Sequence, residues 1–314
     1  MHERRAFLCG VTGTAVACLG GCLGGGGGGG SGDPGTFPVL SEPTLAEYAM
    51  EGQDESTGRI DAAELGYTDH ASLSDQETHL PDAYANRLGD PPPNSRTGRA
   101  GSTFESIDTV GAGFVETRRY GGDGIELVGL ASGRVELTTG AYDPSGFREA
   151  MSLGATPDEQ YDGYDVHYTS EDGDEQSGGF ALGDGTLLYG SGHASLPRYL
   201  VDRAEGGSPA SWIRNAIGRA EPFDIGVLSY HRTSGSVEQS TGLGLVAFEV
   251  EGERTTYKWV EAAPNDGGFR ASWDEARLRE RYEGREIDDL TIETNGTHGI
   301  LQGTIDTSVI ESFD

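Results

Sequence analysis

Two short stretches of the sequence combine residue types that catalysis or cofactor binding requires. Gly190-Ser191-Gly192-His193 places a hydroxyl near an imidazole, the pairing of a serine nucleophile with its base. It lacks the Gly-x-Ser-x-Gly elbow, and no acid is placed to orient His193, so a turn of small residues is the favoured interpretation. Gly242-x-Gly244-x-x-Ala247 matches a dinucleotide fingerprint, but a strand pattern follows it where the fingerprint needs a helix. We therefore expect no catalytic residue and no cofactor.

Metal ligands are present in two places, but neither has the spacing of a metal site. The acidic run Glu171-Asp172-Gly173-Asp174-Glu175 offers oxygen ligands without the spacing of a calcium loop. His70 and His79 lack carboxylates at helical spacing. Solvated charge explains both stretches, so we expect no metal. In a chain with 52 acidic residues, neighbouring carboxylates carry no information about hydrolytic chemistry.

One modification motif is present. Asn295-Gly296-Thr297 is the only Asn-x-Ser/Thr acceptor for N-glycosylation in the sequence, and an exported protein could use it. The same residues have the Asn-Gly signal of a two-residue hairpin turn. Asn295 is therefore both a candidate glycosylation site and a candidate turn residue.

The N-terminal residues have the order of an export and lipid-attachment signal. Arg4 and Arg5 precede a weakly apolar stretch that is too short and too poor in Leu and Ile to span a bilayer. The pair resembles a twin-arginine export signal, and Leu19-Gly20-Gly21-Cys22 resembles a lipobox. The resemblance implies that the Cys22 thiol is joined to a lipid, that residues 1–22 act as the signal, and that the protein faces the cell exterior from the membrane.

The three cysteines of the chain are Cys9, Cys18 and Cys22. If everything before Cys22 is removed, the mature protein keeps no thiol for a disulfide, a metal or a nucleophile. The formal net charge is −30, and Lys258 is the only lysine. Such a surface needs salt to screen its self-repulsion, and it resembles proteins of extremely halophilic archaea. Nucleic acid is not an expected partner, because phosphate binding needs dense Lys and Arg.

Composition divides the rest of the chain. Residues 23–35 are a glycine-rich tether, and 36–103 are polar with few large apolar residues, which predicts a partly ordered stalk. Strand and helix patterns then recur as strand–strand–helix–strand–strand in 104–207 and again in 208–314. Local signals within these patterns predict a pair of strands over 242–252 and 254–262, turns at Ser132-Gly133 and Asp184-Gly185, a helix capped by Asp143 with Pro144 in its first turn, and a helix opened by a capping box of Ser272 and Glu275. We expect an α+β fold of two similar modules, each an antiparallel sheet with helices on one face.

The stretches "TGAYDPSGFREAM", "YDGYDVHY", "FALGDGTLLYGS" and "YLVDRAEGG", together with the N-terminal motifs, resemble exported lipoproteins of halophilic archaea whose function is uncharacterised. The resemblance covers residues 1–30 and 125–207 and carries no catalytic residues over. We therefore expect a membrane-anchored cell-surface lipoprotein with a non-catalytic binding or structural role, whose partner is an unknown protein or small molecule. The alternatives are an exported hydrolase that uses carboxylates and a solute-binding lipoprotein of a transporter.

Overall fold

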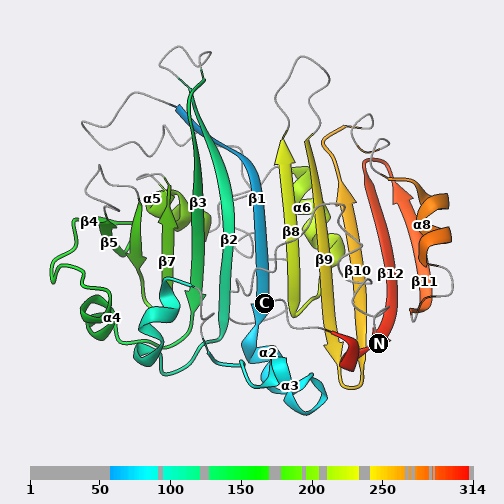
Figure 1. Ribbon diagram of the computed structural model, residues 1–314, viewed down its shortest axis with the longest axis horizontal. Coiled ribbons are helices and arrows are strands. Elements are labelled where there is room, and N and C mark those ends of the chain that lie inside the picture. Colours follow the sequence, from blue (N-terminus) through cyan, green and yellow to red (C-terminus); the bar gives the residue numbers. More distant parts are fainter. Residues whose placement is uncertain are drawn as a thin grey trace.

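The computed structural model describes residues 57–90, 95–120, 127–169, 178–192, 196–204, 211–232, 241–265, 269, 273–282, 285 and 287–310. Within them, twelve strands form one antiparallel sheet in the order β11-β12-β10-β9-β8-β1-β2-β3-β7-β6-β5-β4 (Figure 1). The strands are β1 Thr57–Asp69, β2 Thr109–Tyr120, β3 Leu127–Thr139, β4 Glu159–Tyr161, β5 Tyr164–Thr169, β6 Gly178–Leu182, β7 Thr186–Ser191, β8 Ile225–Arg232, β9 Thr241–Glu251, β10 Arg254–Ala262, β11 Asp288–Asn295 and β12 His298–Asp306. The helices are α2 His70–Ser74, η3 Glu77–His79, α3 Asp82–Ala85, η4 Thr97–Thr103, α4 Pro144–Ala150, α5 Leu196–Ala204, α6 Ser211–Ala220, α8 Glu275–Tyr282 and η5 Thr307–Val309.

Strand β1 lies at the centre of the sheet, hydrogen-bonded to β2 on one side and to β8 on the other. The prediction of two separate modules is therefore wrong, because a single sheet runs through both. β1 comes from segment 36–103, which we expected to be a polar stalk. Its Ala63, Leu65 and Tyr67 are buried and alternate with polar or small residues. A strand buried on one face needs only this alternation, so few large apolar residues suffice.

The pairing explains why the element order recurs along the sequence. Each half of the sheet begins with a three-stranded meander, β1-β2-β3 or β8-β9-β10. A helix follows the meander, α4 in the first half and α8 in the second. The last strand of each half, β7 or β12, then returns to pair with β3 or β10. The two halves meet where β1 pairs with β8.

Helices lie on both faces of the sheet, which corrects the expectation of helices on one face only. α5 packs on β6 and β7, and α6 packs on β9 and β10 (Figure 1). Alternate residues of β9 separate the two faces: Leu243 and Leu245 belong to the core under α5 and α6, whereas Val246 and Phe248 belong to a core on the opposite face.

The opposite face has a separate core over each half. η4 and α4 cover the first half, where Ala100 and Phe147 pack with Phe180. α2 and α8 contribute Leu73 and Leu278 to the core over the second half. Strands β1 and β2 lie between these two cores, at the centre of this face.

Several local predictions are confirmed. Asp143 caps α4 by accepting the Ser145 N–H at 2.9 Å, and Pro144 occupies its first turn. The predicted hairpin between β6 and β7 forms with Gly185 at φ 70°, and the pair β9–β10 forms as well. Among the described residues, no helix is long and apolar enough to cross a membrane.

The predicted turn at Ser132-Gly133 is wrong, because β3 runs straight through both residues. A Cβ on Gly133 would collide with the carbonyl oxygen of Ser191, so the glycine permits close approach of two backbones. The cap of α8 also differs from the prediction. Asp274 accepts the Arg277 N–H at 3.0 Å, so it caps α8 in place of the Ser272 capping box, and Ser272 itself lies outside the described residues.

Candidate binding face

The sequence-predicted site residues are distributed unevenly over the described residues. Arg4, Arg5 and Cys22 lie outside them, as does the acidic loop considered for a cation. Asn295 is described and exposed, and it is the last residue of β11. Ser191 ends β7, and its hydroxyl accepts the backbone N–H of Arg134 at 3.0 Å. This hydroxyl therefore bonds to strand β3.

A row of side chains crosses four central strands on the face opposite α5 and α6. Ser229 of β8, Glu64 of β1, Phe114 of β2 and Arg134 of β3 are direct cross-strand partners, which gives them a common face. We call these four residues the Phe114 row. Phe114 is 42% exposed, and it is the only large hydrophobic side chain exposed in the described part of the chain. The ring therefore offers one apolar contact point at the centre of the sheet.

Arg134 holds the exposed ring from one side. Its guanidinium carbon lies 5.2 Å from the centroid of the Phe114 ring, a cation–π contact. Arg134 Nε also lies 3.7 Å from Oε1 of the buried Glu136. One guanidinium thus joins the exposed ring to a buried carboxylate, which limits the orientations open to both side chains.

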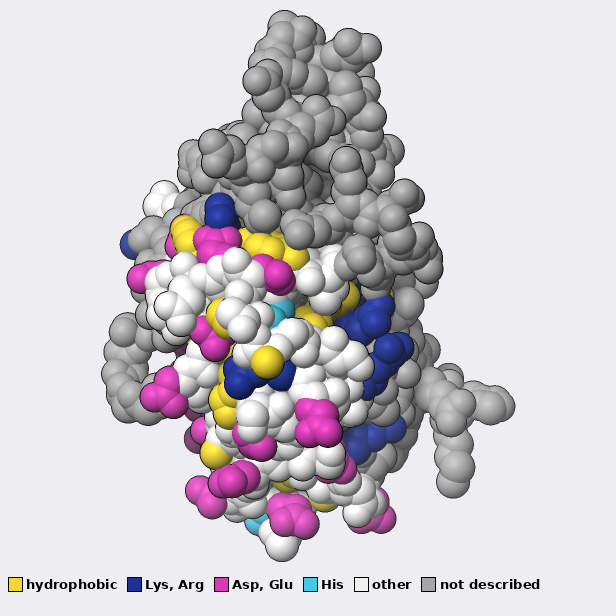
Figure 2. All heavy atoms as spheres, turned by 90° about the vertical axis from the view of Figure 1, so that its left-hand side faces the viewer, with side chains coloured by type: hydrophobic (Ala, Val, Ile, Leu, Met, Phe, Trp, Pro, Cys, Tyr) yellow, Lys and Arg dark blue, Asp and Glu magenta, His cyan; other side chains and the backbone are white. Residues whose placement is uncertain are grey.

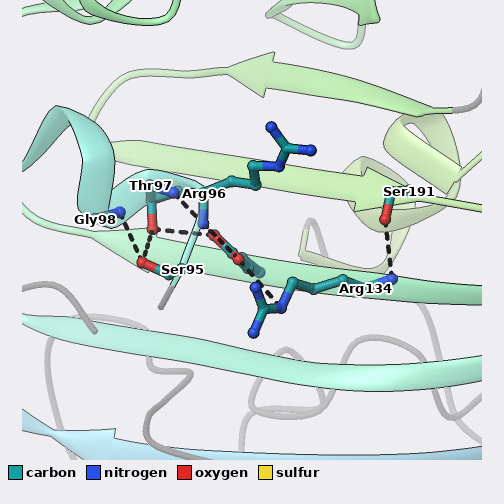
Figure 3. Close-up of polar contacts among 7 residues, drawn as sticks. Ser95, Arg96, Thr97, Gly98, Arg134 and Ser191 are labelled. Carbon is teal, nitrogen blue, oxygen red and sulfur yellow. Dashed lines mark hydrogen bonds and ion pairs between the residues drawn. The ribbon is translucent and has the colours of Figure 1, made fainter. Parts of the chain in front are cut away.

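Glu136 is 2% exposed and anchors the start of η4 to strand β3. Its carboxylate accepts the backbone N–H of Arg96 at 2.8 Å and that of Thr97 at 3.0 Å, and the Thr97 hydroxyl lies 3.2 Å from Oε2 (Figure 3). The hydroxyl of Ser95 accepts the Gly98 N–H at 2.6 Å in the same turn (Figure 3). Backbone N–H groups and the hydroxyls of Ser95 and Thr97 therefore fix the start of η4 together.

Burial raises the pKa of Glu136, whereas the backbone hydrogen bonds from Thr97 and Arg96 and the charge of Arg134 lower it. Both carboxylate oxygens are bonded to backbone N–H groups. The carboxylate of Glu136 therefore positions η4 and Arg134.

The Phe114 row can bind but carries no reactive pair. It presents an aromatic ring, a guanidinium and the half-buried carboxylate of Glu64, and Glu116 is exposed two residues further along β2. These groups interact by stacking, ion pairing and hydrogen bonding. Within the described ranges, no group of three or more His, Cys, Asp or Glu could hold a metal ion.

A second polar cluster ties α5 to the β4 end of the sheet. Glu159 Oε2 accepts hydrogen bonds from Arg198 Nε at 3.0 Å, from Arg198 Nη2 at 2.6 Å and from the Tyr168 hydroxyl at 3.0 Å. The Tyr161 hydroxyl donates to Asp202 at 3.0 Å. Figure 2 shows this end of the molecule with acidic side chains scattered over it. The cluster joins a helix to two strands, which is a structural role.

The only lysine of the chain is buried. Lys258 is 7% exposed, and its Nζ donates to the carbonyl oxygens of Glu221 at 2.9 Å and Pro222 at 3.3 Å. These carbonyls directly follow α6, whose C-terminal end favours a cation. Burial lowers the pKa of Lys258, and the nearby carboxylates of Glu249 and Glu221 oppose that effect. Lys258 therefore fixes the connection between α6 and β8.

No motif or residue spacing in the sequence marks Phe114, Arg134 or Glu136. A signal was present in the stretch from Val110 to Glu116, where residues alternate in the manner of a strand. Which of its two faces is covered depends on strands and helices far away in the sequence, so the alternation alone could not mark Phe114 as exposed.

No protein-family model matches the chain, and no curated protein matches it in sequence. One solved structure, "Structure of crystal form IV of TP0453", aligns over 85% of this chain and 94% of its own, with 8% sequence identity and a TM-score of 0.38. A similarity this weak establishes neither a shared fold nor a shared function.

Proposed function

We propose that this protein is a lipoprotein held at the outer surface of the cell membrane through Cys22 and that it binds a partner, without catalysis, at the Phe114 row. The observation that carries the binding role is the exposed Phe114 ring at the centre of the sheet, held by Arg134, which Glu136 holds in turn. The paired arginines and the LGGC stretch support the anchor. Nothing among the described residues favours the hydrolase or the solute-binding alternative over this role.

The anchor is tested by fractionating cells of a halophilic host. The Cys22→Ser variant is expected to leave the membrane fraction, because it lacks the thiol that would carry the lipid. The Cys18→Ser variant is the matched control and should stay in the membrane, since that cysteine lies in the part to be removed. The Arg4→Lys/Arg5→Lys double variant should accumulate inside the cell. A Cys22→Ser chain that remains in the membrane at the wild-type mass would show that the lipid assignment is wrong.

The binding role is tested by crosslinking on intact cells in high salt. The wild-type chain should give a crosslinked species that Phe114→Ala loses, because the variant removes the exposed ring without disturbing a core. Leu290→Ala, on the outer strand β11, is the control and should keep the wild-type crosslinks. Wild-type crosslinks in Phe114→Ala would refute the assignment of this face, whatever the anchor experiment shows.

A further inference from the structure

The structure separates the two sequence interpretations of Asn295. The hairpin between β11 and β12 turns on Gly296 and Thr297, and Asn295 pairs with His298 as the last strand residue. Among residues 295–298, only Gly296 has a positive φ, 62°, so the turn requires glycine at its first central position and makes no demand on the residue before it. Turn chemistry therefore accounts for Gly296 and not for Asn295, whose side chain is exposed.

Asn295 also lies on the edge strand with the greater length available for pairing with another chain. An end strand presents unpaired backbone groups on which another chain can pair. At the other end, β4 has only three residues, but β11 has eight. Two features protect β11: a register shift between Asp288 and Thr291, with Asp289 at φ 53°, and acidic side chains along the strand. In the regular stretch from Thr291 to Asn295, Glu293 supplies the only charged side chain.

High salt weakens that protection. The Debye length falls to about 3 Å at 1 M salt, so a carboxylate on β11 repels another chain only at contact distance. The composition of this chain, with a net charge of −30 and one lysine, suits a high-salt medium. An uncharged, bulky group next to the edge would not lose its effect in such a medium.

We propose that Asn295 carries an N-linked oligosaccharide that covers the outer edge of β11. The donor would be an oligosaccharide joined to a lipid carrier through phosphate. Asn295 Nδ2 attacks the first sugar carbon, the carbon–nitrogen bond forms as the carbon–oxygen bond to phosphate breaks, and the Nδ2 proton is released while the phosphate leaves with the bond electrons. The inference rests on the exterior location in the proposed function, since the acceptor must reach the compartment of the donor.

The modification is tested by mass spectrometry of the full chain from a halophilic host. One version carries its own N-terminal signal, and the other carries the export signal of a secreted host protein. The second version is exported even if residues 1–22 are not an export signal, so the glycosylation test does not depend on them. The C-terminal tryptic peptide, residues 286–314, should carry a glycan mass in the wild type and in Thr297→Ser. It should lose that mass completely in Asn295→Gln and Thr297→Val. An unmodified peptide from the exported second version would overturn the proposal.

The covering role is tested by light scattering in high-salt solution. Asn295→Gln should self-associate more than the wild type, and glycan-free wild-type chain from a host without the transferase should behave like Asn295→Gln. Asn265→Gln, an exposed asparagine outside any acceptor motif, is the control and should match the glycosylated wild type. Equal scattering from the glycosylated and glycan-free chains would refute the edge-covering role.

Discussion

The buried histidine of α2 gives a sharp prediction about stability and pH. His70 is 6% exposed, and its Nδ1 accepts the backbone N–H of Gly89 at 3.0 Å. An acceptor nitrogen carries no proton, so the imidazole is neutral in the folded protein. Burial lowers the pKa of His70 from 6.5 to about 4, and the nearby Asp90 opposes this only in part.

The sign and size of the effect follow from linkage. Because the folded chain has the lower pKa, the unfolded chain binds the proton first as the pH falls below 6.5. The stability that neutral His70 contributes is complete above pH 6.5 and is lost as the pH falls toward 4. At about 1.4 kcal/mol per pKa unit, the wild type should lose about 3 kcal/mol between neutral pH and pH 4 from this group alone.

The His70→Asn variant isolates this contribution, because the asparagine Oδ1 can accept the Gly89 N–H and does not titrate. Urea unfolding at constant high salt, at pH 7.5 and pH 4, should show that the wild type loses about 3 kcal/mol more than the variant. The exposed His79→Asn serves as the control and should behave like the wild type. Equal losses in wild type and His70→Asn, or an NMR titration of His70 near 6.5, would refute the reasoning.

Three further predictions follow from the same structure. Glu136→Ala leaves the Arg96 and Thr97 N–H groups without their buried acceptor, so it should lower the free energy of unfolding in urea by about 2–5 kcal/mol. Phe114→Ala removes an exposed ring and should change that free energy by less than about 0.5 kcal/mol. Lys258→Met should cost about 1–3 kcal/mol by the same measurement, because the variant cannot donate to the carbonyls after α6. The melting temperature, measured by circular dichroism, should fall as the KCl concentration is lowered, because the net charge of −30 is then less screened. A melting temperature that stays constant as the KCl concentration changes would contradict this prediction.

Local signals in the sequence predicted local elements well. The cap at Asp143 and the hairpin glycine Gly185 act within a few residues, so their effect is visible in the sequence. Gly133 shows the limit of prediction from local signals. A glycine that permits the close approach of Ser191 cannot be distinguished in the sequence from a glycine in a turn. The backbone that requires a glycine at position 133 belongs to another strand, β7.

The exposure of Phe114 and the burial of Glu136 could not be predicted for a related reason. Glu136 sits in a pattern that suits a sheet with one wet face, yet its carboxylate is buried because η4, which precedes it in the chain, folds over it. Phe114 occupies an apolar position and is exposed, because the cores of this face lie on either side of it. Burial in both cases is decided by contacts between distant segments, which alternation along one strand does not encode.

The pairing of β1 with β8 explains why the halves form one sheet. Separate modules would each expose a long inner edge, β1 in one and β8 in the other, with unpaired backbone N–H and C=O groups. Pairing removes both edges and places Leu65 opposite Leu228 in the shared core under α5 and α6. The remaining edges are β4, which is too short to template a partner strand, and β11, which carries the register shift, the acidic residues and Asn295. We propose the centre of the face opposite α5 and α6, where the Phe114 row lies, as the surface on which a partner is bound without being added to the sheet.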